Sequence, residues 1–227
     1  MKSHGKKSDK SFEKWNRDEI ARAFDVKRLP HSPLLEKWLQ FSSPISQEEK
    51  AVLETLRQSL EANADIWNEE ELKFKFISFV VNMAQLDTDV SRSFLDRKIT
   101  AVVQDRTMSG VVDFLVATGN IEPQEPFFFL HEYKQERKRE SDPLGQLLAA
   151  MLTAQALNES EGRKPHPIYG CYVVGRMWFF VVLKGLEYSV SQEYVATQEA
   201  IFGIVSALRF VREQILEILQ DSSRTGL

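Results

Sequence analysis

The stretch that decides the fold consists of two apolar runs, GVVDFLVA at residues 110–117 and FFFLHEYK at residues 127–134. Val, Phe and Leu dominate both runs and a polar break containing glycine separates them, a pattern typical of buried strands. Asp113 lies in the first run, and Glu132 lies near the end of the second. Because side chains alternate between the faces of a strand, Glu132 and Lys134 point the same way. A buried carboxylate beside an ammonium is costly, so this pair is the first candidate for a functional role.

Further strands and helices are expected on either side of this stretch. The strands are predicted at residues 97–103, 110–118, 126–133, 169–174 and 177–184, and the helices at residues 69–83, 142–158 and 193–219. Gly175 and Arg176 join the last two strands as a short hairpin. The order predicts an α/β fold, in which helices flank a mixed central β-sheet. The crossover from the third strand to the fourth should be right-handed.

Capping side chains mark where three helices begin. Ser46 and Asn68 are suited to accept hydrogen bonds from the first free backbone amides of the helices that follow them. Asp142 is expected in the same role for the next helix, with Pro143 in its first turn. Helix 69–83 should bury one apolar stripe, made of Leu72, Phe76, Phe79, Val80 and Met83.

Composition divides the chain into three parts. Residues 1–12 are polar and rich in lysine, and we expect a disordered tail whose lysines either remain solvated or contact phosphates. Residues 13–67 are expected to form an N-terminal helical region that packs on the core or serves as a partner-binding surface. Residues 68–220 form the core domain.

Composition also narrows the classes of function. The 227 residues include one cysteine, Cys171, which excludes an internal disulfide and a zinc ribbon and, among apolar neighbours, predicts a buried, inert thiol. No apolar segment reaches the length of a membrane span, and the N-terminus is polar without an apolar core, which favours a cytoplasmic location. The phosphate-binding patterns GxGxxG and GxxxxGK[ST] are missing, which gives a nucleotide-binding enzyme little support. The net charge of −4 neither requires nor excludes a polyanionic partner.

The acidic residues suit a divalent cation. Mg²⁺ prefers hard oxygen ligands, and Asp113 and Glu132 on neighbouring strands would supply two carboxylates. The backbone carbonyl of Tyr133 is a candidate third ligand, and Lys134 would position or help to deprotonate a water molecule. Glu69 would reach the cluster from the facing helix, through a water or as the ligand of a second metal.

The pattern resembles that of the PD-(D/E)xK phosphodiesterase superfamily, whose fold is that of the restriction endonucleases. The resemblance rests on GVVDF at residues 110–114, on LHEYK at residues 130–134, and on the following helix with Gln146. Residues 68–77 look like the family's leading helix, whose first glutamate matches Glu69.

This resemblance covers roughly residues 68–190 and leaves the N-terminal helical region outside it. Val112 stands where the family name has a proline, a departure that the superfamily tolerates. The resemblance implies a restriction endonuclease-like core and a DNA substrate, with RNA still open. It also implies a Mg²⁺ or Mn²⁺ cofactor and, for cleavage of both strands, a homodimer. Gln146 would orient water or backbone in such a site.

Each candidate residue also has a structural interpretation. Asp113 would simply pair with Lys134, Glu69 would favour the positive end of the helix dipole, and Gln146 would lie on a helix surface. The basic run Arg137, Lys138 and Arg139 would be solvated rather than bound to DNA phosphates. His131 alternates away from Glu132, and for it we prefer the structural role.

Two hypotheses of different classes follow. The favoured one is a metal-dependent nuclease that hydrolyses DNA phosphodiester bonds. The alternative is a non-catalytic, nuclease-like module that binds protein or nucleic acid through its N-terminal helices. Because all the key side chains are present, the first is preferred.

Overall fold

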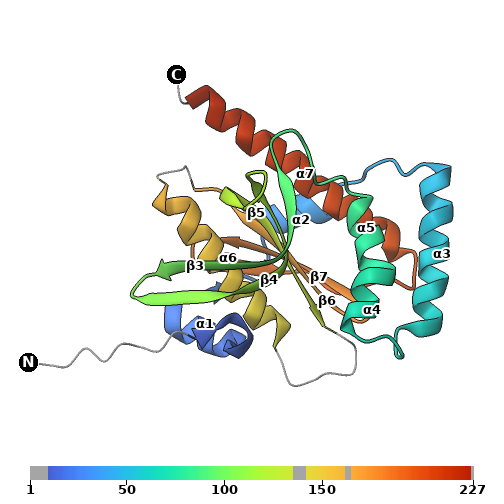
Figure 1. Ribbon diagram of the computed structural model, residues 1–227, viewed down its shortest axis with the longest axis horizontal. Helices are drawn as coiled ribbons and strands as arrows, with labels where there is room; N and C mark the ends of the chain where they lie inside the picture. Colours follow the sequence, from blue (N-terminus) through green and yellow to red (C-terminus); the bar gives the residue numbers. More distant parts are fainter. Residues whose placement is uncertain (1–9, 135–141, 162–164, 226–227) are drawn as a thin grey trace, which may run out of the picture.

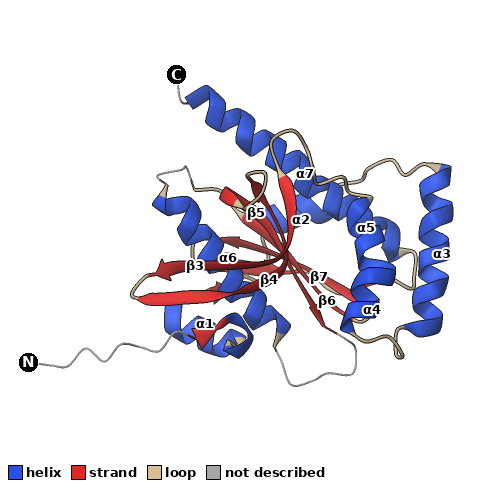
Figure 2. Ribbon diagram, in the orientation of Figure 1, coloured by secondary structure: helices blue, strands red, loops and turns tan. Residues whose placement is uncertain are grey.

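The computed structural model describes residues 10–134, 142–161 and 165–225. Within these ranges helices cover both faces of one mixed β-sheet (Figures 1 and 2), which confirms the predicted α/β class. The sheet has nine strands in these ranges, in the order β1-β4-β5-β6-β7-β8-β2, with β3 paired to β4 and β9 paired to β7.

The long strands form the centre of the sheet. They are β3 (Arg92–Val103), β4 (Arg106–Thr118), β5 (Gln124–Lys134), β6 (Ile168–Val174), β7 (Met177–Lys184) and β8 (Glu187–Val190). Strands β5 and β6 run parallel, whereas β3, β4 and β5, and likewise β6, β7 and β8, pair antiparallel. The short strands are β1 (Lys10–Ser11), β2 (Lys27–Arg28) and β9 (Tyr194–Val195).

Two helical layers enclose the sheet. The helices are α1 (Arg17–Phe24), α2 (Pro33–Leu39), α3 (Gln47–Asn63), α4 (Glu69–Leu72), the π-helical turn η2 (Lys73–Ile77), α5 (Ser78–Asn82), α6 (Pro143–Ser160) and α7 (Ala200–Thr225), with a short 3-10 turn η1 (Phe12–Lys14). Helices α1 and α6 pack in one apolar core, and α2 to α5 with α7 pack in the other. The N-terminal helices therefore share a core with the sheet.

The predicted capping roles of Ser46 and Asn68 are confirmed, and that of Asp142 is wrong. Asn68 and Ser46 each accept a hydrogen bond from the third helical amide and complete a reciprocal capping box. Asp142 is the residue before α6, but its side chain makes no capping bond. Its Oδ2 instead accepts hydrogen bonds from the backbone N–H of Arg17, at 2.8 Å, and from Nε of the same residue, at 3.1 Å. Asp142 therefore joins α1 to the start of α6.

The helix predicted at residues 69–83 contains an unexpected π-turn. Because one extra residue per turn shifts the phase of a helix, Ile77 and Val81 become buried beside Phe76 and Val80, whereas Phe79 is 50% exposed. The prediction that Phe79 belongs to the buried apolar stripe is therefore wrong.

Two strand and helix boundaries also differ from the prediction. Strand β3 begins at Arg92 rather than at residue 97, because it pairs with β4 as far as Ala117. Helix α7 begins at Ala200 rather than at residue 193, because Tyr194 and Val195 pair with β7 as strand β9. Edge strands of two residues carry no periodicity that a sequence pattern detects.

The tail expected at residues 1–12 overlaps ordered structure. Lys10 and Ser11 pair with β4, and Phe12 is fully buried against Gly110. A Cβ at Gly110 would lie 2.3 Å from Cγ of Phe12, so only glycine leaves room for that ring. Disorder is therefore the wrong expectation for residues 10–12.

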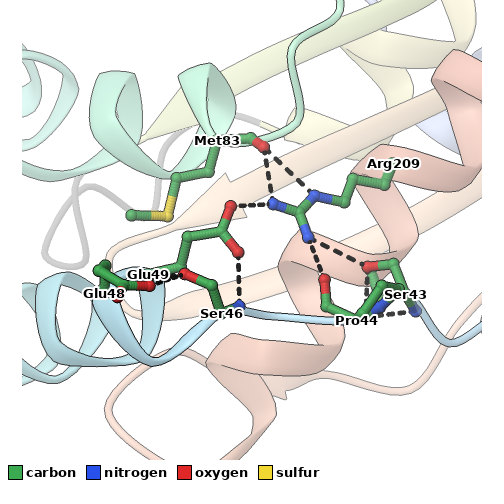
Figure 3. Close-up of polar contacts among 8 residues, drawn as sticks. Ser43, Pro44, Ser46, Glu48, Glu49, Met83 and Arg209 are labelled. Carbon is green, nitrogen blue, oxygen red and sulfur yellow. Dashed lines mark hydrogen bonds and ion pairs between the residues drawn. The ribbon is translucent and has the colours of Figure 1, made fainter.

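Arg209 joins α7 to the N-terminal region (Figure 3). Its guanidinium donates hydrogen bonds to the carbonyl oxygens of Pro44, at 2.7 Å, and Met83, at 3.3 Å, and to the carboxylate of Glu49. Ser43 adds a contact at 3.5 Å. One side chain on α7 thus fixes the loop before α3, the first turn of α3 and the end of α5.

Candidate functional site

The candidate site lies where β4 and β5 stop pairing. The last paired residues at this end are Phe114 and His131. Beyond them the backbone N–H of Tyr133 donates a 2.9 Å hydrogen bond to Oδ2 of Asp113 instead of to a β4 carbonyl. The Asp113 side chain therefore takes the place of the next ladder bond and stands in the gap between the strands.

The helical segment α4–η2 supplies the second part of the site. Nζ of Lys73 lies 3.0 Å from Oδ1 of Asp113 and 3.2 Å from Oε1 of Glu69. Glu70 makes a third contact with the same ammonium, at 3.2 Å, but its side chain is 82% exposed. Glu69, predicted to reach the strands from its helix, does so through this shared lysine.

Glu132 supplies the third part, from the opposite layer. It is fully buried, and its Oε2 accepts a 2.7 Å hydrogen bond from Nε2 of Gln146 on α6. Among the described residues, Oε1 of Glu132 has no hydrogen-bond partner although it is buried. Gln146 is 4% exposed, so its interpretation as a helix-surface residue is wrong.

The two carboxyl groups meet across the gap. Burial and the negative charge of Asp113 raise the pKa of Glu132 well above its ordinary value, while Lys134 and Lys73 act in the opposite direction. The surroundings of Glu132 therefore favour its protonated form more than water does. Side chains from both helical layers reach one spot because the sheet is open there.

Lys134 stands beside the acids. Its Nζ lies 3.9 Å from Oε2 of Glu69, and its side chain is mostly buried. The structural alternative paired Asp113 with Lys134, but in the structure Asp113 forms its ion pair with Lys73, at 3.0 Å. Among the described residues, the ion pair of Lys134 with Glu69 is long, and it therefore compensates the ammonium charge only weakly.

Lys73 is the residue that sequence reasoning missed. Burial alone would lower the pKa of its ammonium, but Asp113, Glu70 and Glu69 together raise it above its ordinary value. Its spacing from Glu69 is the i, i+4 spacing of a helical ion pair, and this was the one signal present in the sequence. No signal in the sequence indicated the contact with Asp113, which lies 40 positions away.

Tyr133 and His131 complete the surroundings. Tyr133 contributes its backbone N–H to Asp113, and the use of its carbonyl as a ligand stays a prediction. His131 is buried among the rings of Phe129, Tyr133 and Trp178, and burial lowers its pKa to about 3. It is a neutral core residue on the face away from Glu132, as predicted.

The remaining predictions have mixed outcomes. Arg137, Lys138 and Arg139 lie outside the described residues. Cys171 is fully buried and its surroundings raise the pKa of the thiol, as expected for an inert cysteine. In the part of the chain that the structure describes, no helix is long and apolar enough to cross a membrane.

The side chains of the site have the oxygen ligands that a hard divalent cation requires. Carboxylate oxygens are the ligands that Mg²⁺ and Mn²⁺ prefer, and the buried oxygen Oε1 of Glu132 lacks any partner. The described residues contain no group of three or more His, Cys, Asp or Glu side chains already arranged around one metal position. The ammonium of Lys73 lies between Glu69 and Asp113, where it separates these two acids.

An open cavity of about 340 Å³ adjoins the acids. Its wall contains Lys73 and Phe74 of η2, Leu95 and Asp96 of β3, and Asp113 of β4. The site is therefore reached from solvent along the Asp113 side, while Glu132 lies behind it.

Compared with models of known protein families and with curated protein sequences, the chain matches none.

Proposed function

We propose that this chain is a metal-dependent nuclease with a restriction endonuclease-like core that hydrolyses DNA phosphodiester bonds. One observation carries the proposal: Asp113 and Glu132, from adjacent strands, meet where those strands separate, and one oxygen of the buried Glu132 has no partner. An unsatisfied buried carboxylate destabilises the fold unless another group uses it. Glu69 and Lys134 border the same spot.

Asp113 and Glu132 would hold the metal, with Glu69 reaching it from α4. Bound there, Mg²⁺ or Mn²⁺ would supply Lewis-acid stabilisation of the phosphoryl oxygens and an acidified water. Gln146 positions Glu132 by donating to Oε2, which leaves Oε1 as the oxygen available for a ligand. Because the pKa of Glu132 is raised, a proton competes with the metal for this carboxylate, and metal binding should weaken as pH falls.

Lys134 would act on the reacting water and phosphate. Its ammonium lies near Glu69 and on the same strand as Glu132, so it can orient the attacking water beside the metal ligands. In the reaction the water oxygen forms a bond to phosphorus while its proton passes to solvent. The bond from phosphorus to the leaving oxygen breaks, and that oxygen takes a proton from water.

The test is cleavage of supercoiled plasmid with Mg²⁺ or Mn²⁺, followed as nicked and linear product. Asp113→Asn and Lys134→Met should each reduce cleavage by at least about a hundredfold, because each removes a group that acts on the transition state. Equal cleavage by the wild-type protein and both variants would refute the assigned site. A labelled RNA of the same sequence tests the substrate, and linear product from single encounters would indicate a homodimer that cuts both strands.

A specific observation favours the alternative, a non-catalytic module. Lys73 pairs with Asp113, and the raised pKa of Glu132 favours its neutral form, so the charges of these two acids are compensated without a metal. Calorimetric titration with Mn²⁺ separates the two. The nuclease predicts a binding isotherm that Glu132→Ala abolishes, and the module predicts no binding in either protein.

A further inference from the structure

Lys73 occupies the position that a cation would take between two of the acids. Its ammonium contacts Glu69 at 3.2 Å and Asp113 at 3.0 Å, from opposite sides of the gap between α4 and β4. Both distances are those of direct ion pairs. No other described lysine or arginine is recorded in an ion pair with Asp113, so Lys73 is the group that compensates its charge there.

Each carboxylate oxygen of Asp113 and Glu69 already faces an N–H group or an ammonium. Oδ2 of Asp113 accepts from the Tyr133 N–H, and Oδ1 faces Lys73. Oε1 of Glu69 faces Lys73, and Oε2 faces Lys134. A metal that binds both acids must therefore move the Lys73 ammonium away from at least one of them.

The backbone conformation at Lys73 helps to explain why its side chain contacts Asp113 on β4. Lys73 is the first residue of the π-turn η2, which interrupts an otherwise regular helix. A π-turn widens the helix by one residue and is found frequently at functional sites. Here it places Lys73 toward β4, while Phe74 is 79% exposed and Phe76 is buried.

We propose that Lys73 is an internal counter-ion that competes with the divalent metal for Glu69 and Asp113. The inference rests on the metal site of the proposed function and adds a positioning role to it. In the metal-free protein Lys73 holds the two acids together against their mutual repulsion. When a metal binds, the carboxylates exchange one monovalent ammonium for a divalent ion, and the affinity that is measured is reduced by the contacts that Lys73 gives up.

The decisive experiment is calorimetric titration of Mn²⁺ alone into four proteins: wild type, Lys73→Met, Lys73→Arg and Lys75→Met. Lys73→Met should bind Mn²⁺ at least about tenfold more tightly than the wild type, because the competitor is gone. Lys73→Arg keeps the competing charge and should not gain affinity. Lys75, which pairs with Glu71 on the same helical segment, is the matched control and should leave the affinity unchanged.

Salt separates displacement from a distant charge effect. In about 1 M KCl the Debye length is about 3 Å, so a long-range effect is screened while a group in direct contact still competes. The gain in Lys73→Met should persist under these conditions. If Lys73→Met folds poorly, Lys73→Gln, which keeps a polar side chain, should show the same direction of change.

The possible results distinguish this inference from the proposed function. An unchanged or weaker Mn²⁺ affinity in Lys73→Met, or a gain that disappears in high salt, overturns the counter-ion role even if the wild type cleaves DNA. A persistent gain without any DNA cleavage would support the counter-ion role and refute the nuclease. No Mn²⁺ binding in any of the four proteins would refute both.

Discussion

Lys73 and Arg209 each gather acceptors from several elements, but the two clusters differ in charge balance. Arg209 contacts one carboxylate, Glu49, and otherwise neutral carbonyl and hydroxyl oxygens (Figure 3). Lys73 contacts three carboxylates with one ammonium. A guanidinium with a planar fork of donors suits a fixed geometry, whereas an ammonium on a flexible stem is more easily moved. We infer that Arg209 stabilises the fold, and that Lys73 is a counter-ion that a metal can displace.

The largest expected effect is on the fold, from Arg209→Met. This change leaves the carboxylate of Glu49 and the carbonyls of Pro44 and Met83 without their donor. We expect a loss of about 2–4 kcal/mol in the free energy of unfolding, measured by urea denaturation. The Mn²⁺ affinity of the folded fraction should not change, and a change there would mean that the two clusters are linked.

Glu132→Gln should have the next largest effect and should stabilise the protein. The pKa of Glu132 is raised from its ordinary value of 4.5, so the folded state binds more protons than the unfolded state above that pH. Wild-type stability therefore falls as pH rises from 4.5 through the raised pKa, and the glutamine variant lacks this loss. At pH 8 we expect a gain of about 1–3 kcal/mol, shrinking toward pH 4.5.

The same substitution should abolish metal binding. A gain in stability together with a loss of Mn²⁺ binding would show that the buried acid is kept for a ligand rather than for folding. A loss of stability at pH 8 would contradict the raised pKa of Glu132.

Lys73→Met tests the comparison directly and should cost less than Arg209→Met. Removing the ammonium exposes Glu69 and Asp113 to each other, but both side chains retain some contact with water. We expect a loss of about 1 kcal/mol without metal, measured by urea denaturation. Excess Mn²⁺ should recover this loss, because the metal supplies the missing positive charge. A loss as large as that of Arg209→Met would make Lys73 a structural clamp of the same kind.

Glu70→Gln should have the smallest effect. Glu70 reaches Lys73 but is 82% exposed, so water already screens its charge. Stability should change by less than about 0.5 kcal/mol, and Mn²⁺ affinity by less than about threefold. Glu69→Gln, at the neighbouring and more buried position, should weaken Mn²⁺ binding more, and equal effects of the two would contradict the assignment of Glu69.

Much of the site could be predicted because it depends on local rules. Alternation along β5 correctly placed Glu132 and His131 on opposite faces, since Glu132 bonds to Gln146 of α6 and His131 packs among Phe129, Tyr133 and Trp178. The capping pattern at Asn68 correctly marked the start of the helix that carries Glu69. Both are short-range regularities that a single sequence displays.

The rest depends on contacts between distant segments. The pairing of β3 with β4, the π-turn at Lys73 and the bond from Asp142 to Arg17 follow from tertiary packing. In the sequence Lys73 has only the i, i+4 spacing from Glu69, and only the folded arrangement brings it to Asp113. Propensity and periodicity do not determine such contacts.

The π-turn η2 contains one residue more than an α-turn, so it accommodates a residue that a regular helix would not. Deleting one residue between positions 73 and 77 would let the segment close as a regular α-helix, and α4 before it and α5 after it would keep about their present relative orientation. The same deletion inside the regular helix α6 would rotate one part of that helix by about 100° relative to the other. The length of the chain can therefore change by one residue in η2 with the helices on either side still in place, and the side chains of η2 itself, Lys73 among them, would be the ones to move.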